Sequence, residues 1–435
     1  MKNTPIDFNI VSKVIKESGH ECVGKASIRE IRFLIDTIEK QTGDKFIRME
    51  MGIPGFPAPK IATDAEKQAL DNGVASLYPN IDGVPELKTE ISRFVKNYIN
   101  IDVSPKACIP TVGSINGNYG TFMVAGRMDE KKDTVLFIDP GFPVHKQLVK
   151  MLGLKHESFD VYNYRGEKLK EKLESYLKKG NISIILYSNP NNPTWICFNE
   201  QELQIIGELA TKYDVVVEED LAYFAMDFRK DMSKPGEPPY QPSVAKYTDN
   251  YVLMISSSKA FSYAGQRVGM MCISDKLFNR NFDRLLKFYS TANFGHATAY
   301  GTIYATTAGV THSAQYGLLA LLKATNNGEY NPWKVVREYG ERAKKAKKIF
   351  IDNGFNIVYD TDIDQPIANG FYFTISYPGF TGEQLLEELM YYGISAISLS
   401  TTGSEREGLR ACVSFIADSQ FPQLEERLKS FNENH

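Results

Sequence analysis

One lysine in this sequence has neighbours that suit chemistry on a carbonyl compound. Lys259 follows an apolar run and lies in SSSKAFSYAGQRVG, residues 256–269, with three serines before it and Arg267 after it. A lysine amine forms Schiff bases with carbonyl groups, and does so best when its neighbours lower its pKa. Hydroxyl groups and a guanidinium suit a phosphate dianion. Carbonyl chemistry and phosphate binding in one segment point to pyridoxal phosphate.

A second group of candidates is acidic. Glu218, Glu219 and Asp220 end the apolar run of VVVEEDLAYFAM, residues 215–226. The carboxyl end of a buried strand is where open α/β sheets bind ligands. A carboxylate there could pair with a pyridinium nitrogen and preserve the ring as an electron sink. On chemistry alone the three acids compete.

Three loops complete the pattern. The small, glycine-rich TVGSINGNYG at 111–120 leads into a predicted helix and can aim backbone N–H groups at a phosphate, but it fits neither GxGxxG nor the P-loop. SNPNNPT at 188–194 follows an apolar run, and DPGFPVHK at 139–146 offers Phe142 as a ring for stacking. Each such loop alone is usually a plain turn, so only the combination of all three indicates a cofactor site.

In this order the segments resemble the fold-type I pyridoxal-phosphate-dependent aminotransferases of class I/II, the aspartate aminotransferase superfamily. The resemblance implies Lys259 as the Schiff-base lysine and proton carrier, with Ser256 and Arg267 on the cofactor phosphate. The family's D-x-x-Y spacing selects Asp220 for the pyridine nitrogen and Tyr223 for the 3-oxygen.

The same resemblance implies the rest of the site. The remaining cofactor contacts would be the phosphate cup of Gly113, Ser114 and Ile115, the stacking ring of Phe142, the 3-oxygen donor Asn192, and Tyr78 of LYPNIDGVPELK, which would reach the neighbouring subunit's phosphate. A homodimer with shared active sites is therefore implied. Substrate contacts would be Gly52, Asn192 and Arg410, the last clamping the α-carboxylate, with Arg406 as a nearby rival.

The sequence departs from the family pattern at three places. Trp195 stands where glycine is usual, and we expect it to reshape the pocket wall. The stretch 288–301 lacks the second arginine of dicarboxylate-specific relatives, and 397–408 lacks the usual Pro-Gly turn. Aromatic residues near the site (Phe56, Phe142, Trp195 and Tyr223) allow an aromatic or large apolar substrate.

The expected activity is transfer of an amino group between an L-amino acid and a 2-oxo acid. The first alternative is a β-eliminating lyase of the C–S lyase type, because a fold does not fix its chemistry. A remote alternative is a non-catalytic ligand sensor. No metal is expected to take part.

The elements that position these residues predict an α/β fold. Between about residues 60 and 310, helical patterns alternate with short β-rich runs at 134–139, 182–187, 215–219, 251–255 and 268–273. Near-continuous apolar runs are typical of strands covered on both faces, so we predict a mainly parallel sheet with helices on each side.

The flanking sequence predicts a smaller α+β domain. Its elements are a helix at 26–41 capped by Ser27 and Glu30, one long helix at 332–354, strands at 370–376 and 394–398, and a last helix from about Pro422. A chain of 435 residues exceeds the ~250–300 residues of a single core. We therefore predict a large cofactor-binding domain at 51–315, a small C-terminal domain at 316–435, and an N-terminal segment at 1–50 that contributes to the small domain.

Composition limits the partners. With 43% hydrophobic and 24% charged residues and a net charge of −3, nothing suggests nucleic acid or an anionic membrane as a partner. The five cysteines are scattered without CxxC spacing, which predicts isolated buried thiols rather than disulfides or a zinc site. No apolar run suits a membrane span or a signal peptide, so we expect a reducing cytoplasmic location.

Overall fold

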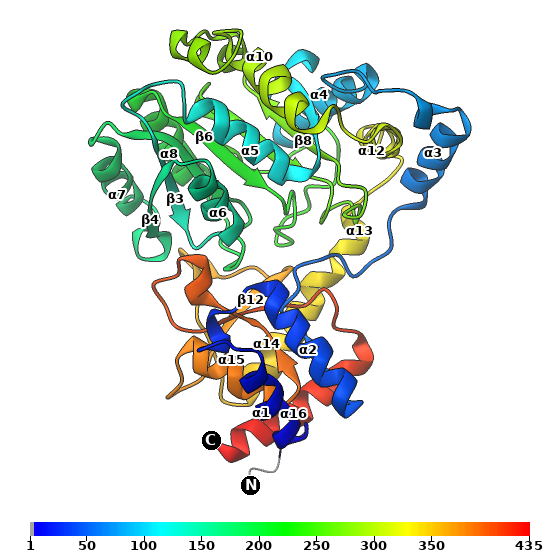
Figure 1. Ribbon diagram of the computed structural model, residues 1–435, viewed down its shortest axis with the longest axis vertical. Helices are drawn as coiled ribbons and strands as arrows, with labels where there is room; N and C mark the ends of the chain where they lie inside the picture. The colour runs from blue at the N-terminus through cyan, green and yellow to red at the C-terminus, as the bar shows by residue number, and fades with distance from the viewer. Residues whose placement is uncertain (1–3) are drawn as a thin grey trace. The chain divides into compact units, whose positions relative to one another are not determined.

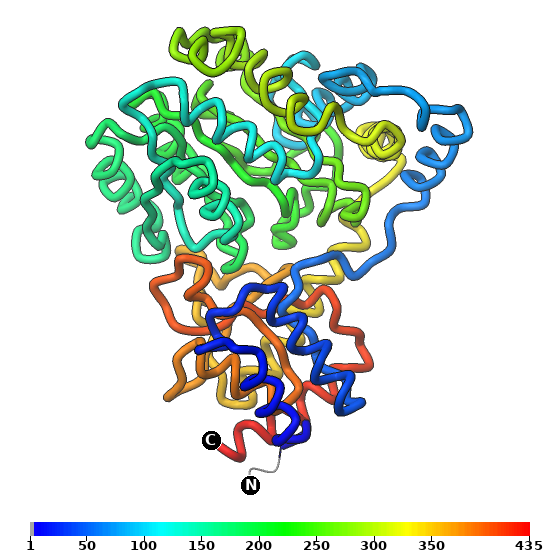
Figure 2. Tube along the Cα trace, viewed as in Figure 1, coloured from blue at the N-terminus to red at the C-terminus, as the bar shows by residue number. Residues whose placement is uncertain are grey.

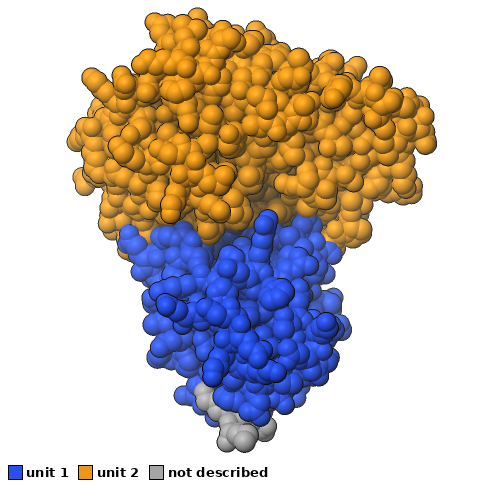
Figure 3. Space-filling view, in the orientation of Figure 1, with its two compact units in different colours: residues 1–55, 192–196, 337–435 blue, residues 56–191, 197–336 orange. Residues whose placement is uncertain are grey.

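The computed structural model describes residues 4–435, which divide into two compact units (Figure 3). Unit 1 contains residues up to Gly55, 192–196 and 337–435, whereas unit 2 contains 56–191 and 197–336. The first and the last described residues therefore both belong to unit 1, whose segments are blue and orange to red at the two ends of the trace (Figure 2). The sequence placed its domain boundaries at 50/51 and 315/316, and that domain assignment stays a prediction.

Unit 2 is built on a seven-stranded sheet with helices packed around it (Figure 1). The strand order is β2 (Cys108–Thr111), β8 (Gly269–Ile273), β7 (Tyr251–Ser256), β6 (Val216–Leu221), β5 (Ile182–Ser188), β3 (Thr134–Asp139) and β4 (Lys155–Asp160). β8 is antiparallel to both of its neighbours, β2 and β7, and the other neighbouring pairs of the sheet are parallel. Every residue of β3, β5, β6, β7 and β8 is buried, so side chains on both faces are covered. The predicted mainly parallel sheet is confirmed.

The helices of unit 2 follow the strands in alternation. They include α3 (Lys60–Asp71), α4 (Pro85–Ile99), α5 (Gly113–Ala125), α6 (Pro143–Met151), α7 (Lys168–Leu177), α8 (Glu200–Tyr213), α12 (His312–Asn326) and the short α13 (Trp333–Val336). An aromatic cluster fills the core beside α4, where Phe94 packs within 4.9 Å of Phe224 and Trp333 lies 5.0 Å from Tyr98, measured between ring centroids. The Trp333 indole N–H donates to the Phe224 carbonyl.

Unit 1 has the α+β character that the sequence predicts. A four-stranded antiparallel sheet has the order β14 (Ile397–Ser398), β15 (Leu409–Cys412), β12 (Tyr372–Ser376) and β9 (Asn356–Ile357), and β1 (Ile47–Arg48) pairs with β13 (Ile394–Ser395). The helices are α1 (Phe8–Glu17), α2 (Ile28–Thr42), α14 (Glu338–Asp352), α15 (Gly382–Tyr391) and α16 (Phe421–Asn434). The predicted capping box of α2 is present, because Ser27 and Glu30 bind each other's backbone N–H.

Three sequence expectations need correction. The strand predicted at 394–398 is two strands, β13 and β14, which belong to different sheets. The long helix predicted at 332–354 is interrupted at Arg337, where the chain passes from unit 2 to unit 1. The five thiols are free, but Cys22 and Cys197 are only half-buried. Cys108 and Cys272 are buried but not isolated, because antiparallel pairing sets them opposite each other on β2 and β8.

Two kinds of larger feature are absent from residues 4–435. No helix there is long and apolar enough to cross a membrane. No group of three or more His, Cys, Asp or Glu side chains in that range is placed to hold a metal ion.

Candidate active site

A loop between two antiparallel strands of unit 2 carries the candidate lysine. Lys259 is half-buried between β7 and β8, in a segment closed by the Tyr263 N–H, which donates to the Ser257 carbonyl at 3.1 Å. At the start of the loop, the Ser258 N–H donates to the Ser256 hydroxyl at 3.1 Å. At its end, Arg267 has a left-handed backbone with φ of +51°. The loop thus returns the chain to β8 with both ends fixed to the sheet.

Arg267 lies against the N-terminus of α5. A Cβ on Gly113 would lie 2.2 Å from its Nη2 atom, so only glycine leaves room for the guanidinium there. Gly113 also has φ of +66°, and Val112 gives the helix no side-chain cap. A guanidinium beside uncapped N–H groups forms a site with positive potential, which suits a phosphate dianion.

The partners of Arg267 leave its charge unbalanced. Its Nη1 donates to the Ala264 carbonyl at 2.9 Å and lies 3.5 Å from the Ser258 hydroxyl. No carboxylate within residues 4–435 pairs with it. The buried Thr111 hydroxyl, immediately before this helix, also has no hydrogen-bond partner. Gly113, Ser114, Ser256 and Arg267 therefore lie on segments that meet at one place, and Ser258 joins them without having been predicted.

Asp220 ends β6 as a buried carboxylate. Its Oδ1 accepts the Ala222 N–H at 3.1 Å, and its Oδ2 lies 3.9 Å from Nε2 of His145. Burial raises the pKa of Asp220 to about 7, opposed by the Ala222 hydrogen bond and by the positive charge of Lys259. Burial lowers the pKa of His145 to about 4, so its imidazole is neutral near pH 7.

The other two acids of β6 are occupied by protein groups. Glu218 accepts a hydrogen bond from the Asn118 side chain of α5, and burial raises its pKa. Glu219 accepts from the Ser243 hydroxyl and from the Val244 N–H at 3.2 Å. Of the three acids, only Asp220 has a pKa that the charge of Lys259 lowers. The geometry therefore favours Asp220 as the ligand-facing carboxylate.

Three further cofactor candidates lie in the same unit. Tyr223 is buried in the segment after β6, and Ile115 is half-buried in the first turn of α5. Phe142 caps α6 and packs edge-on against His145 at 5.5 Å between centroids. His145 was missed by the sequence reasoning, although DPGFPVHK contained it, because a histidine beside an acid on another strand leaves no spacing signal.

The predicted substrate residues lie together in unit 1. Arg410 of β15 is only 3% exposed. Its Nη2 donates to the Glu50 carbonyl, its Nη1 lies 3.4 Å from Oδ1 of Asn192, and its Nε has no partner. No carboxylate in the described part of the chain pairs with it. A buried cation without an anion is costly, which is the state expected of a site that awaits an anionic ligand.

The rival and the remaining candidates are placed as follows. Arg406 is half-exposed over the Tyr359 ring, which favours Arg410 as the carboxylate ligand. Gly52 lies against the Tyr372 hydroxyl, which would be 1.9 Å from a Cβ at that position. Trp195 is fully buried inside unit 1, and Tyr78 of unit 2 is 88% exposed.

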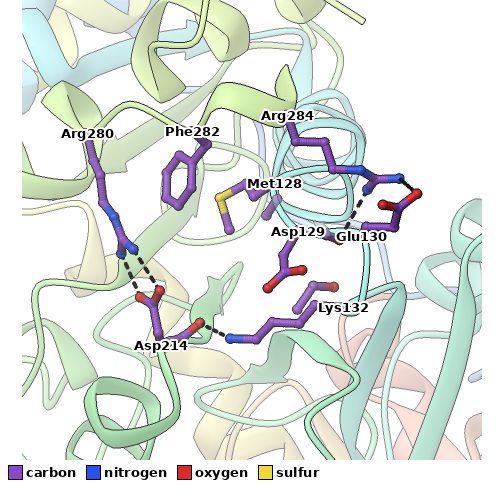
Figure 4. Close-up of a pocket in the computed structure, with 10 residues that line it drawn as sticks. Met128, Asp129, Glu130, Lys132, Asp214, Arg280, Phe282 and Arg284 are labelled. Carbon is purple, nitrogen blue, oxygen red and sulfur yellow. Dashed lines mark hydrogen bonds and ion pairs between the residues drawn. The ribbon is translucent and has the colours of Figure 1, made fainter. Parts of the chain in front are cut away.

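A separate cavity of about 320 Å³ lies at the other end of the sheet (Figure 4). Ser183 at the start of β5 and Asp214 at the end of α8 line it. Its cations are engaged by protein groups: Arg280 binds Asp214 at 2.6 and 2.7 Å, and Lys132 donates to the carbonyls of Tyr213 and Asp214. This cavity is therefore distinct from the candidate site, which lies at the carboxyl ends of β6 and β7.

Comparison with known proteins agrees with this geometry. Residues 44–321 match the family described as aminotransferase class I and II. A probable aspartate aminotransferase of Methanocaldococcus jannaschii is 27% identical over 316 residues, which cover 72% of this chain and 74% of that protein. Aromatic-amino-acid aminotransferase 2 of Thermococcus litoralis is 28% identical, with 56% of this chain and 60% of that protein covered.

A solved structure extends the likeness to nearly the whole chain. The alanine aminotransferase from Pyrococcus furiosus superposes with a TM-score of 0.77 at 18% identity, covering 95% of this chain and 98% of that one. At such low identity the likeness shows the fold.

Proposed function

The chain belongs to the aminotransferase class I and II family, and on this premise we propose that it binds pyridoxal 5′-phosphate at Lys259 and moves amino groups between an L-amino acid and a 2-oxo acid. The proposal rests on the arrangement of three groups in unit 2. The charge of Lys259 lowers the pKa of the buried Asp220 carboxyl group, and Arg267 lies at the α5 N-terminus without a carboxylate partner among the described residues. These groups match the ring nitrogen, aldehyde and phosphate of the cofactor.

The residues of unit 2 fit this group. Arg267, Gly113, Ser114, Ile115 and Ser256 would hold the phosphate, since the place beside Gly113 is one that a Cβ would fill. Asp220 would hold a proton on the ring nitrogen, Tyr223 would donate to the 3-oxygen, and Phe142 would cover the ring face. When bound, the cofactor withdraws electrons from the α-carbon of the substrate.

Proton transfer is the task of Lys259. Its Nζ would accept the α-proton of the amino acid and return it on the cofactor side, as a general base and then a general acid. His145 would act on Asp220 as a positioning residue, because its neutral ring lies 3.9 Å from the carboxylate and adds no competing charge. In unit 1, Arg410 would bind the substrate's α-carboxylate through its guanidinium fork. Gly52 and Asn192 would provide the other substrate contacts.

We further propose a homodimer in which Tyr78 completes the partner's phosphate site. Leu77 (61% exposed) and Ile81 (45%) of the same loop are also exposed, and the partly exposed Tyr300 (36%) interacts with Asp82, the residue after Ile81. The loop that carries Tyr78 lies against the N-terminus of α12, since the Leu77 carbonyl is 3.2 Å from Nδ1 of His312. Contiguous exposed apolar surface is typical of an interface between chains.

We also propose that the enzyme works in the cytoplasm. The support is chemical, because all five cysteines are free thiols. They include Cys108 and Cys272, which lie opposite each other on β2 and β8 and which a reducing compartment would keep from forming a disulfide. Fractionation of cells that express the tagged protein would test this location.

The decisive test of the function is Lys259→Ala. We expect this variant to lose turnover and the visible absorption band of the lysine-bound cofactor, whereas the exposed control Lys276→Ala keeps both. Turnover by a clean Lys259→Ala preparation would overturn the proposal.

Single amino acids added to the loaded enzyme then identify the reaction. Transamination converts the cofactor to its amine form with no oxo acid present. Steady release of pyruvate from a β-substituted amino acid would instead indicate the lyase, and no reaction with any amino acid would indicate a sensor. Neither alternative has an observation in its favour.

A further inference from the structure

Arg410 is held in unit 1 by neutral groups alone. Below its guanidinium lies the ring of Tyr372, with the guanidinium carbon 4.6 Å from the ring centroid. The other contacts are the Glu50 carbonyl and the Asn192 amide oxygen. The Glu50 carboxylate itself is turned to Ser395 and to Nε of Arg48, 3.3 Å away. Arg410 is therefore fixed without losing its charge to an anion.

Tyr372 is itself fixed from two sides. Its hydroxyl occupies the space that a side chain on Gly52 would need. Its ring meets the indole of Trp195, with centroids 6.1 Å apart and planes inclined by 68°. The indole in turn lies where a Cβ on Gly370 would stand, 2.0 Å from one ring carbon. Gly52 thus leaves room for the ring of Tyr372, and Gly370 leaves room for the indole of Trp195.

Trp195 holds this place in a backbone conformation that large residues rarely adopt. Its φ is +66° and its side chain is fully buried. A bulky residue persists in this region only when the packing around it fixes the conformation. Trp195 therefore belongs to the internal structure of unit 1, and it can influence the substrate through Tyr372.

We propose that Trp195 and Tyr372 are positioning residues that hold the Arg410 guanidinium flat, with its edge open to the substrate's α-carboxylate. A guanidinium stacked on an aromatic face keeps its edge free for a bidentate carboxylate. Without the ring, the flexible side chain of Arg410 must be ordered by the substrate itself. This inference rests on the proposed role of Arg410.

The test compares amino acids with the amines that lack their α-carboxylate. Single-turnover reactions of the loaded enzyme are followed by loss of the visible cofactor band, with L-phenylalanine against 2-phenylethylamine and L-aspartate against β-alanine. For each pair, the kcat/KM of the amino acid is divided by that of the amine. This ratio, taken for the pair whose amino acid the wild type converts faster, measures the contribution of the α-carboxylate. Variants are Arg410→Leu, Tyr372→Leu, Tyr372→Phe and Trp195→Phe.

We expect Tyr372→Leu to reduce this ratio by about tenfold, the size of a buried cation–π contact. The loss should appear in the KM of the amino acid, while kcat/KM for the amine stays constant. Tyr372→Phe keeps the ring and should keep most of the ratio, and Trp195→Phe should fall between them. The matched control is Tyr359→Leu. Tyr359 is as buried in unit 1 as Tyr372, but the guanidinium over its ring is that of Arg406 instead of Arg410.

The outcomes separate the two proposals. If the wild type shows no preference for the amino acid, or if Arg410→Leu keeps that preference, the role of Arg410 is wrong and this inference falls with it. If Arg410→Leu abolishes the preference but Tyr372→Leu and Trp195→Phe match the Tyr359→Leu control, only the positioning role is overturned. Should Tyr372→Leu fail to fold, Trp195→Phe in wild-type and Arg410→Leu backgrounds decides, because a positioning effect disappears when the arginine is absent.

Discussion

At the scale of single residues, the buried carboxyl group of Glu219 makes the stability of the protein depend on pH. Burial raises its pKa from 4.5 to about 7, against the hydrogen bonds from Ser243 and Val244. The folded state therefore holds this proton more tightly than the unfolded chain does. Its contribution to stability is complete below pH 4.5 and is lost as the pH rises through 7.

Glu219→Gln should remove this loss, because an amide resembles the neutral acid and does not titrate. Between pH 5 and pH 8 the free energy of unfolding of the cofactor-free protein should fall in both proteins. The fall should be larger in the wild type than in the variant, by up to about 3 kcal/mol. Urea titrations at the two pH values measure the difference. Glu174→Gln is the control, since the pKa of Glu174 is lowered to about 2 and lies outside this interval. Equal pH dependence in wild type and Glu219→Gln would contradict the prediction.

Gly113 tests the phosphate site. Gly113→Ala should weaken binding of pyridoxal phosphate at least about tenfold, because the new Cβ displaces the Arg267 guanidinium. Gly153→Ala is a matched control: its φ of +69° imposes similar backbone strain, but nothing lies within 4 Å of the added carbon. Both variants should lose about 1 kcal/mol of stability. Titration with the cofactor separates them, and equal affinities would refute the assignment of Arg267.

The sequence indicated which residues suit the chemistry better than it indicated which residues contact one another. Lys259 and Arg267 stand out because their segment contains every group that a phosphate-bearing aldehyde needs. Choosing Asp220 among three consecutive acids required the family spacing, since alternation along a strand does not say which face meets a ligand. His145 and Ser258 could not be found, because their roles depend on distances between strands and across a turn.

At the scale of elements, the C-terminus of α8 depends on charges from other parts of unit 2. Asp214 ends the helix with φ of +49°, Arg280 binds its carboxylate through two nitrogens, and Lys132 donates to the last carbonyls (Figure 4). The Arg280 guanidinium also lies 4.5 Å above the Phe282 ring. The hydrogen bond from Arg280 lowers the pKa of Asp214, so this pair stabilises the fold above the usual aspartate pKa and less at acid pH.

Arg280→Met should lower the free energy of unfolding by about 0.5–1 kcal/mol at pH 7, because the pair is well aligned but half-exposed. Lys276→Met is its control. Lys276 pairs with Asp249 through one contact at 3.3 Å with both side chains largely exposed, so the change should be near zero. Denaturant midpoints of the two variants provide the comparison, and equal losses would show that alignment does not matter here.

Periodicity identified the buried strands but not the edges of the sheet. β3 and β5 to β8 were predicted within two residues because each contains or adjoins a run of apolar residues. β4 (KHESFD) is an edge strand with polar, partly exposed residues, and β2 has only four residues, so neither gave a signal. The division of 394–398 into two strands depends on separate pairing partners, β1 and β15, which are distant in sequence.

At the scale of the whole molecule, the proposed dimer can be tested by complementation. Lys259→Ala and Tyr78→Phe should each have little activity alone. In a mixed dimer, one site would combine Lys259 of the second variant with Tyr78 of the first, so mixing after mild dissociation should restore activity. A Lys259→Ala and Arg267→Ala mixture is the control, because both residues would serve the site of their own subunit, so each site of that mixed dimer carries one of the two changes.

Restoration by Tyr78→Phe beyond that control would support a tyrosine acting across the interface, and restoration no greater than the control would refute it. Sedimentation equilibrium of Leu77→Asp measures assembly independently. We expect this variant to dissociate, whereas Phe33→Asp, which changes a 72% exposed ring of unit 1, should not.

The division into units was the part of the organisation least accessible from sequence. Residues 192–196 lie in the middle of the chain between segments of unit 2, yet they belong to unit 1. No composition change marks this short segment. Its assignment follows from the contacts of Trp195 and Asn192 with Tyr372 and Arg410, which only folding brings together.

The same short segment has a spectroscopic consequence. The chain contains two tryptophans, and the units divide them, with Trp195 in unit 1 and Trp333 in the aromatic core of unit 2. Both indoles are buried, at 0% and 3% exposure, so both should emit in the blue and shift to the red on unfolding. Each unit therefore contains its own intrinsic fluorophore. A Trp333→Phe chain would report the melting of unit 1 alone, without any label.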